Sequence, residues 1–273
     1  MVPNVQDISN LAEEGKAIRL DLFTKLCAVQ EGHPGSILSI FDFVNLMYLG
    51  GYIRVDSSSN SSDSFIMSKG HAAAVQYPYL VKFGIIPKQE WDNWGVAETR
   101  LRVFGNNTIP GIDVTSGSLG HGVGIGAGIA LANQMNNIDA KVYVVISEGE
   151  LYEGSTWEAL LFLAHHKLTN VKVVLDVNRN MILGRPEDCV ALESIDKKME
   201  AFNLKTMRID GHDYTQLQAG LNFLDNAADM PSVLILDTIK GKGVSFMEDQ
   251  PESHYWGGLS QQKMDQMLKD LAQ

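Results

Sequence analysis

Two oxygen-bearing residues in the middle of the chain are placed so that they could bind a divalent cation together. Glu148 follows the apolar run Lys141–Ile146, and Asn178 follows the apolar run Val171–Asp176. Carboxylate and amide oxygens are hard ligands that suit Mg²⁺ or Ca²⁺. If both runs are strands of one parallel sheet, their carboxyl ends meet at one edge, and ligands bind beyond that edge. The spacing therefore predicts a cation site between two neighbouring strand ends.

The segment after Glu148 is suited to hold a phosphorylated ligand. Gly149 lets the backbone approach a ligand closely, and a helix is expected over Gly154–His166. The first turn of a helix offers free N–H groups and the positive end of its dipole, which can bind a diphosphate. An acidic residue near a helix start can also be no more than a cap. For either loop alone capping is the simpler interpretation, whereas the two loops together favour a binding site.

The elements that would position these loops alternate between strands and helices. Short β-rich runs separated by helical patterns indicate βαβ units, and hence an α/β fold with a mostly parallel sheet and helices on both faces. Neither a linker nor an internal repeat interrupts the pattern, so residues 1–273 are expected to form a single domain. Strands are expected at Phe65–Met67, Lys141–Ile146, Val171–Asp176, Lys205–Ile209 and Val233–Asp237, and helices at Ile8–Gln30, Ile37–Leu49, Ala72–Phe83, Gly154–His166, Tyr214–Leu224 and Ser260–Leu271.

Composition excludes several classes of partner. The formal net charge is -11, so nucleic acid is not expected, because binding its phosphates would need a basic face. The two cysteines, Cys27 and Cys189, are too few for a disulfide framework and predict a reducing cytoplasm. The N-terminus does not read as a signal peptide and no apolar run is long enough to span a bilayer, so no membrane association is expected.

Five motifs, in this order along the chain, resemble those of the first domain of transketolases. The most specific is Ser147–Ala159 followed by Leu175–Asn178, which is similar to the family's thiamine diphosphate fingerprint. In the family, that fingerprint begins with a Gly-Asp-Gly triplet and ends with a metal-binding Asn. The others are the two histidine motifs Gly32–Gly35 and Ser68–His71, the glycine-rich loop Thr115–Gly122, and Thr238–Gly243 with the following His254, which resembles a loop that closes over the site. The resemblance covers essentially the whole chain, but only the first of the family's three domains.

The resemblance implies a thiamine diphosphate site with a divalent metal, Mg²⁺ or else Ca²⁺ or Mn²⁺. Glu148, Asn178 and the backbone carbonyl of Asn180 would hold the metal, which would bridge the diphosphate oxygens and neutralise their charge. Asn178 would thus belong to both the metal site and the cofactor site.

Further residues would contact the cofactor itself. His71, Gly149 and the N–H of Glu150 would meet the diphosphate. Leu119 and Ile182 would clamp the thiazolium ring, and the Gly117 carbonyl would meet the aminopyrimidine. Without the flanking motifs, Leu119 and Ile182 would read as ordinary packing residues.

Three histidines are the implied catalytic residues. His33, His71 and His254 match family histidines at the substrate channel, where imidazoles transfer protons and hold sugar hydroxyls. A lone histidine is more often a surface group or a satisfied interior group. No chemistry is assigned to the remaining histidines, which are His121, His165, His166 and His212, and His212 is interpreted as a loop residue.

The chain departs from the family pattern at three places. Glu148 is one methylene longer than the usual metal-binding Asp. Asn106 stands where the family usually has a histidine that touches the donor sugar, and Arg179–Met181 replaces a stretch that is usually small or apolar. The cofactor site is therefore expected to be kept and the substrate site altered.

A partner subunit is also implied. In transketolases the glutamate that activates the cofactor belongs to the second domain and reaches across a subunit interface. A chain that matches the first domain alone is expected to need a C-terminal, pyrimidine-binding subunit in an α₂β₂ assembly. Glu153 and Glu158 match carboxylates at the family's subunit interface, although Glu158 could equally be an exposed acid.

The leading hypothesis is a transketolase subunit that transfers a two-carbon ketol unit from a ketose, usually phosphorylated, to an aldose, and that is active only with its partner. One alternative is a subunit of a related thiamine-dependent lyase or decarboxylase acting on a 2-oxo acid. The other is a non-catalytic scaffolding subunit whose metal site was lost through Glu148.

Overall fold

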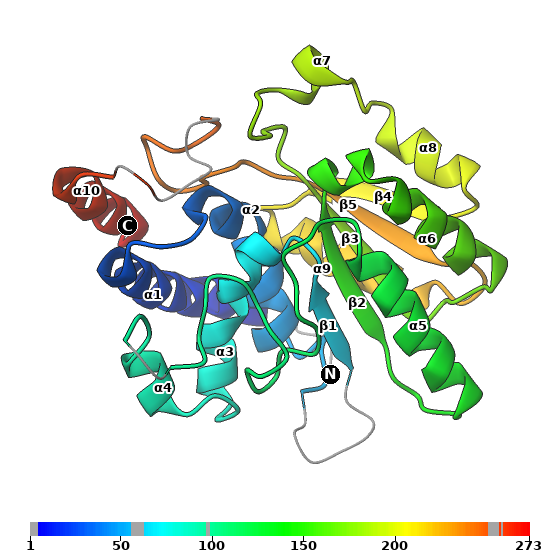
Figure 1. Cartoon of the computed structure of the whole chain (residues 1–273), viewed down its shortest axis with the longest axis horizontal. Coiled ribbons are helices and arrows are strands. Elements are labelled where there is room, and N and C mark those ends of the chain that lie inside the picture. Colours follow the sequence, from blue (N-terminus) through cyan, green and yellow to red (C-terminus); the bar gives the residue numbers. More distant parts are fainter. Residues whose placement is uncertain (1–4, 56–62, 97–98, 251–256, 258) are drawn as a thin grey trace.

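The centre of the molecule is a five-stranded sheet in the order β1-β2-β3-β5-β4, and all four pairs of neighbouring strands are parallel (Figure 1). The structure is a computed structural model that describes residues 5–55, 63–96, 99–250, 257 and 259–273. The parallel sheet confirms the predicted α/β fold. Its strands are β1 (Ser64–Met67), β2 (Val142–Ser147), β3 (Val171–Val177), β4 (Lys205–Asp210) and β5 (Ser232–Asp237).

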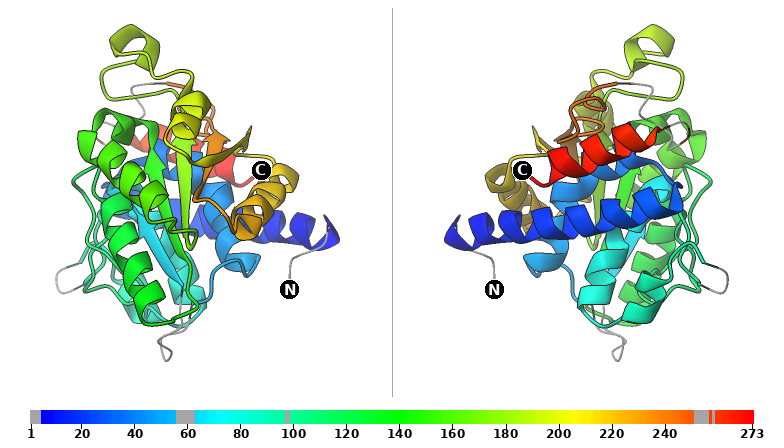
Figure 2. Two further views of the ribbon diagram at one scale, coloured as in Figure 1. Left: turned by 90° about the vertical axis from the view of Figure 1, so that its right-hand side faces the viewer. Right: turned by 90° about the vertical axis from the view of Figure 1, so that its left-hand side faces the viewer.

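Helices cover both faces of this sheet, as the two side views in Figure 2 show. One face is covered by α1 (Val5–Val29), α2 (Pro34–Leu49), the 3₁₀ helix η1 (Gly70–Gln76), α3 (Tyr77–Lys82), α9 (Tyr214–Asn226) and α10 (Gln261–Leu271). The other face is covered by α5 (Gly122–Met135), α6 (Gly154–His165) and α8 (Ile195–Ala201). The short elements α4 (Lys88–Asp92), η2 (Glu148–Tyr152) and α7 (Pro186–Cys189) lie in connections.

Strand β2 shows why the sheet needs cover on both sides. Tyr143 and Val145 point into the core beside α2 and α9, whereas Val142, Val144 and Ile146 point into the core beneath α5 and α6. Alternate residues of a strand face opposite sides of a sheet, so a strand that is apolar at every position is stable only between two layers. In the part of the chain that is described, no helix combines the length and apolarity that a membrane span requires.

Several elements differ from the sequence-based expectation, since α4, η2, α7 and α8 were not expected. Two further differences concern longer segments. The helix expected over Ala72–Phe83 is instead a 3₁₀ helix, η1, followed by the shorter α-helix α3. Helix α5 was not expected at all, because its first half alternates glycine with other residues and glycine is a poor helix former. Packing explains its stability: a Cβ at Gly126 would lie 2.6 Å from Val144 Cγ2, so only glycine lets α5 approach the sheet this closely.

A buried ion pair joins the carboxyl ends of three strands. Asp176, near the end of β3, receives hydrogen bonds from Lys69 Nζ, which follows β1, and from Thr238 Oγ1, which follows β5. Ser39 Oγ of α2 donates to the same carboxylate at 2.7 Å. Burial alone would raise the pKa of Asp176, but the Lys69 ammonium and these hydrogen bonds bring it below its ordinary value. The edge of the sheet that carries the predicted site is therefore fixed by one charged centre.

Helix α5 offers a matched pair of substitutions that tests this account of its packing. Gly126→Ala should lower the free energy of unfolding by about 1–3 kcal/mol, because the added methyl group overpacks the contact with Val144. Gly128→Ala meets no atom within 4 Å and should raise that free energy by up to about 1 kcal/mol through helix propensity. Urea denaturation of the two variants measures both values, and equal effects would contradict the proposed close packing.

The buried ion pair can be tested by a double-mutant cycle. Asp176→Asn leaves the Lys69 ammonium buried without its counter-charge, and Lys69→Met leaves the carboxylate in the same state. Each should lower the free energy of unfolding by about 3–5 kcal/mol. The double variant should lose clearly less than the sum of the two losses, as urea denaturation would measure. Additive losses would mean that the two charges do not stabilise each other.

Candidate cofactor and metal site

A pocket of about 350 Å³ lies at the carboxyl edge of the sheet, above the ends of β2 and β3. Its lining brings together seven residues that the sequence singled out: His71, Leu119, Glu148, Gly149, Asn178, Asn180 and Ile182. They come from the segments that follow β1, β2 and β3 and from the glycine-rich loop before α5. Ser36, Ser147, Tyr152, Met181 and Leu183 complete the lining together with Glu153, which the sequence had placed at a subunit interface and not in this pocket.

Glu148 opens the 3₁₀ helix η2 at the end of β2, and it is a buried carboxyl group with unused hydrogen-bonding capacity. Its side chain accepts hydrogen bonds from the backbone N–H groups of Arg179 and Asn180. Arg179 adopts the left-handed conformation (φ 55°), which turns this part of the β3 loop back on itself. Glu148 Oε1 is buried and has no hydrogen-bond partner among the described residues. Burial, with the nearby Asp176 carboxylate, raises the pKa of Glu148 to about 8.

Asn178 and Asn180 lie opposite Glu148 on the β3 loop, and each is 6% exposed. Asn178 Oδ1 accepts a hydrogen bond from the Asn180 N–H at 3.2 Å, and Asn180 Nδ2 donates to Asp249 at 2.9 Å. Asp249 is itself held by Arg185. Asn180 Oδ1 is a second buried oxygen without a partner among the described residues.

These oxygens fit a divalent cation. Two buried acceptors without donors, Glu148 Oε1 and Asn180 Oδ1, line one pocket, and a hard cation satisfies such oxygens. The described segments contain no group of three or more His, Cys, Asp or Glu side chains placed to hold a metal. The donor set is therefore one carboxylate plus amide and carbonyl oxygens, which suits Mg²⁺ or Ca²⁺ better than Zn²⁺.

Two buried lysines, Lys69 and Lys240, lie near the pocket without lining it, and the sequence had not assigned a role to either. Lys240 lies in the loop after β5, fully buried, and its Nζ donates to the Asn180 carbonyl at 3.4 Å. That carbonyl is the one expected to bind the metal. Burial, with the Lys69 ammonium nearby, lowers the pKa of Lys240 to about 8. An anionic group in the pocket would be stabilised by the Lys240 ammonium, whereas the charge of Lys69 is already paired with Asp176.

The side chain of Glu150 does not line the pocket but lies beneath it. Glu150 Oε2 accepts from the Ser147 N–H at 2.9 Å, and Oε1 accepts from the Gly120 N–H at 3.0 Å and from the Ser68 hydroxyl. This carboxylate therefore ties the end of β2 to the glycine-rich loop and to the Ser68–His71 motif. The contact predicted for the Glu150 N–H remains a prediction.

Of the three residues expected around the rings of the cofactor, two line the pocket and one does not. Leu119 is half-buried and Ile182 is 59% exposed, and both line the pocket. Gly117 lies outside that lining, in the left-handed region (φ 155°), and its amide packs against Gly70: a Cβ on Gly70 would lie 2.7 Å from Gly117 N. The close approach explains why the second histidine motif needs glycine at position 70, whereas at position 117 the backbone conformation favours glycine.

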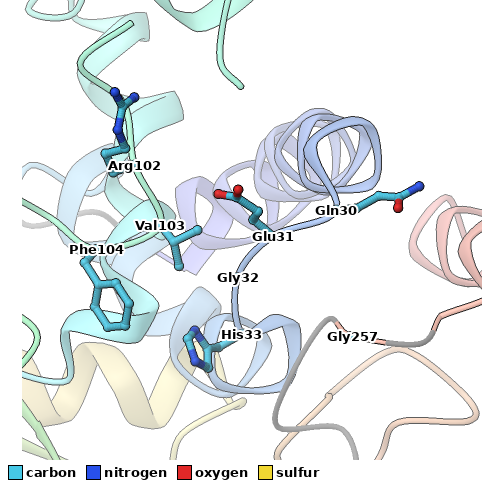
Figure 3. Close-up of a pocket in the computed structure, with 8 residues that line it drawn as sticks. All are labelled: Gln30, Glu31, Gly32, His33, Arg102, Val103, Phe104 and Gly257. Atoms are coloured by element: carbon cyan, nitrogen blue, oxygen red, sulfur yellow. The ribbon is translucent and has the colours of Figure 1, made fainter. Parts of the chain in front are cut away.

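His33 stands between this pocket and a second one of about 670 Å³, which is lined by Gln30, Glu31, Gly32, His33, Arg102, Val103, Phe104 and Gly257 (Figure 3). Its ring centroid is 5.2 Å from that of His71 and 5.7 Å from that of Phe104. Burial, with the Lys240 ammonium, lowers the pKa of His33 to about 4, so its imidazole is neutral at physiological pH. Arg102 points away from His33 and donates to the carbonyls of Thr99 and Leu101.

Asn106, which replaces the expected sugar-binding histidine, forms a local turn. Its Oδ1 accepts hydrogen bonds from the N–H of Thr108 at 3.0 Å and from the Thr108 hydroxyl. Asn106 lines neither of the two pockets. The third predicted catalytic histidine, His254, lies outside the described residues.

The other singled-out residues are mostly at the surface. Glu153 and Glu158 are exposed at the start of α6 and along it, and His121, His165 and His166 are exposed as well. His212 lies in the loop between β4 and α9, as predicted, but its side chain is only 9% exposed and both ring nitrogens are hydrogen-bonded.

Comparison with known proteins agrees with this geometry. A relative from Sinorhizobium fredii, named "Putative uncharacterized transketolase family protein y4mO", is 34% identical over 253 residues, with 90% of each chain covered. An apulose-4-phosphate transketolase subunit from Phocaeicola vulgatus is 31% identical, over 89% of this chain and 86% of that protein. The transketolase structure from Campylobacter jejuni superposes with a TM-score of 0.86 at 24% identity. That likeness supports the fold, and the chain spans only 43% of the Campylobacter protein.

The family assignment follows from these matches. Residues 10–271 match the family model described as "Transketolase, thiamine diphosphate binding domain". Most of the residues that the fingerprint implied as cofactor or metal ligands line one pocket. The chain therefore belongs to the transketolase family and contains its thiamine diphosphate binding domain.

Proposed function

We propose that this chain is the diphosphate- and metal-binding subunit of an enzyme that transfers a two-carbon ketol unit from a ketose, usually a phosphate ester, to an aldose. The observation that carries the proposal is the pocket itself. It combines an unsatisfied buried carboxylate, Glu148, with Asn178 and Asn180, beside a buried lysine, Lys240, in a chain of the transketolase family. Thiamine diphosphate, when bound, supplies a nucleophilic carbon that adds to a ketose carbonyl.

The residues of this chain would divide the work between binding and proton transfer. Glu148, Asn178 and Asn180 would hold Mg²⁺, or else Ca²⁺ or Mn²⁺, while Lys240 would stabilise the charge of the diphosphate. Leu119 and Ile182 would exclude water from the thiazolium ring. His33 and His71 would hold sugar hydroxyls, and the neutral imidazole of His33 can accept a proton from one of them.

A second subunit is part of the proposal. The relative from Phocaeicola vulgatus is named as one subunit of a transketolase, and this chain spans 43% of the Campylobacter transketolase. Apolar side chains are exposed around the pocket and on the outer face of α5 and α6, where a partner could cover them. They include Leu183 at 85%, Val190 at 64%, Met135 at 76% and Leu161 at 55% exposure. We propose a pyrimidine-binding partner in an α₂β₂ assembly, with Glu153 and Glu158 at its interfaces.

We further propose a cytoplasmic location. Cys27 and Cys189 are free thiols, and a reducing compartment keeps thiols in this state.

The partner requirement gives a direct test of function. The purified chain alone, supplied with thiamine diphosphate and Mg²⁺, should transfer no ketol unit from any of a panel of ketose phosphates to aldoses, as followed by mass spectrometry. Addition of a co-expressed pyrimidine-binding subunit should start the transfer. Transfer by the lone chain would contradict the split-subunit proposal. Release of CO₂ from pyruvate by the assembled enzyme would favour the lyase instead.

Glu148 gives a second test, based on the pH dependence of stability in the metal-free chain. The pKa of Glu148 rises from 4.5 to about 8 on folding, so between these values the folded state binds the extra proton. Its stability should therefore fall as the pH rises towards 8. The pKa shifts of His33, from 6.5 to about 4, and of Lys240, from 10.5 to about 8, act mainly outside the window from pH 6.5 to 8.

The matched variants for this test are Glu148→Gln, which cannot titrate, and Glu158→Gln on the exposed face of α6. Urea denaturation in EDTA should show a shallower decline in stability from about pH 6.5 to 8 for Glu148→Gln than for wild type or Glu158→Gln. Calorimetry should also show Mg²⁺-dependent binding of thiamine diphosphate by wild type and its loss in Glu148→Gln. Identical pH slopes of stability in wild type and Glu148→Gln would refute a buried, protonated Glu148. Binding of thiamine diphosphate by wild type that does not depend on Mg²⁺ would favour a scaffolding role for the chain.

A further inference from the structure

His212 lies at the carboxyl edge of the sheet, directly after β4. The turn that carries it is fixed by a hydrogen bond from its own N–H to Asp210 Oδ1 at 2.8 Å. Gly211 makes a close contact with the strand end beside it, since a Cβ there would lie 2.5 Å from Thr238 Cγ2. His212 is therefore packed against the loop after β5, the loop whose Lys240 donates to the carbonyl of the pocket residue Asn180.

The imidazole of His212 makes one hydrogen bond from each ring nitrogen. Nδ1 lies 2.8 Å from Asp42 Oδ2 on α2, and the backbone N–H of Ile239 donates to Nε2 at 2.9 Å. A backbone N–H can only donate, so Nε2 must carry its lone pair. The proton then sits on Nδ1 and is donated to the Asp42 carboxylate. The two neighbours thus select a single neutral tautomer.

Asp42 is held in place by a buried polar chain. The Tyr214 hydroxyl donates to Asp42 Oδ1 at 3.4 Å, and Asn45 Nδ2 donates to that hydroxyl at 2.9 Å. The Tyr79 hydroxyl in turn donates to Asn45 Oδ1 at 2.9 Å. Helices α2, α3 and α9 therefore fix the carboxylate that orients His212.

The residues on either side of Ile239 contact residues that line the cofactor pocket or lie beneath it. Thr238 donates to Asp176, Lys240 donates to the Asn180 carbonyl, and the Gly241 N–H donates to the Gly35 carbonyl at 3.0 Å. The Ile239 N–H links this segment to the loop after β4, through its hydrogen bond to His212 Nε2. A shift of this amide would move Lys240 relative to Asn180.

We propose that His212 is a positioning residue for the cofactor site: its Nε2 holds the Ile239 amide and thereby keeps Lys240 on the Asn180 carbonyl, beside the diphosphate- and metal-binding pocket. The proposal rests on the function proposed above, because it assigns Lys240 a charge-stabilising role towards a bound diphosphate. It gives chemistry to a histidine that sequence reasoning had interpreted as a loop residue.

Two variants of His212 distinguish the hydrogen bond that Nε2 accepts from the packing of the imidazole ring. In His212→Asn the short amide can reach Asp42 but not Ile239, whereas in His212→Gln the longer side chain can place its oxygen near the position of Nε2. His165→Gln, at the exposed end of α6, is the control. Thiamine diphosphate binding is measured by calorimetry with Mg²⁺ on the chain assembled with its partner, and hydrogen exchange of residues 238–241 is measured on the same samples.

His212→Asn should weaken thiamine diphosphate binding about five- to tenfold, the effect of one lost hydrogen bond, and should speed exchange at Ile239. His212→Gln should recover most of the affinity and of the exchange protection, and His165→Gln should change neither. Wild-type affinity and protection in His212→Asn would overturn the proposal. So would equal losses in His212→Asn and His212→Gln, because the ring would then act by packing alone.

The two proposals fail in different ways. If wild type binds no thiamine diphosphate, the proposed function fails, and the exchange data still decide whether His212 holds the Ile239 amide. If wild type binds and the two His212 variants do not differ, only the positioning role fails.

Discussion

The carboxylate of Asp176 is the interaction on which the rest of the site depends. A charge in the interior must be paired and hydrogen-bonded, since leaving it alone costs several kcal/mol. Asp176 meets this requirement with Lys69, Thr238 and Ser39, which come from three different segments. The requirement to satisfy one buried charge therefore brings the carboxyl ends of β1, β3 and β5 together against α2, and the pocket lies at this edge of the sheet.

Glu148 contrasts with Asp176: both carboxyl groups are buried, but among the described residues only Asp176 has a lysine as a salt-bridge partner. The raised pKa of Glu148 and its unsatisfied Oε1 have the same cause: the protein encloses the carboxyl group and supplies only two backbone N–H groups. A carboxylate site that is completed by a bound ion has this appearance when its protein ligands are considered alone. With a side chain one methylene longer than aspartate, Glu148 lines the same pocket as Asn178 and Asn180.

The sequence was most informative where a pattern has one physical solution. Apolar runs alternating with helical patterns can be buried only as a covered parallel sheet, and the loops after Ile146 and Asp176 must then be neighbours. The sequence failed where tertiary contacts decide. The glycines of α5 disfavour a helix locally, and only the sheet beneath them explains the element. The role of Lys240 depends on its contact with Asn180, and that of His212 on its contact with Asp42. Both partners are distant in sequence, so no local sequence pattern predicts these contacts.

The turn at Asn106 bears on how this loop could evolve. Its amide oxygen accepts two hydrogen bonds from Thr108, whereas an imidazole has a single acceptor nitrogen. Introducing the family's usual histidine at this position would therefore break the turn before it could create a sugar contact. A histidine at this position would therefore need a different arrangement of Thr108 to keep the turn.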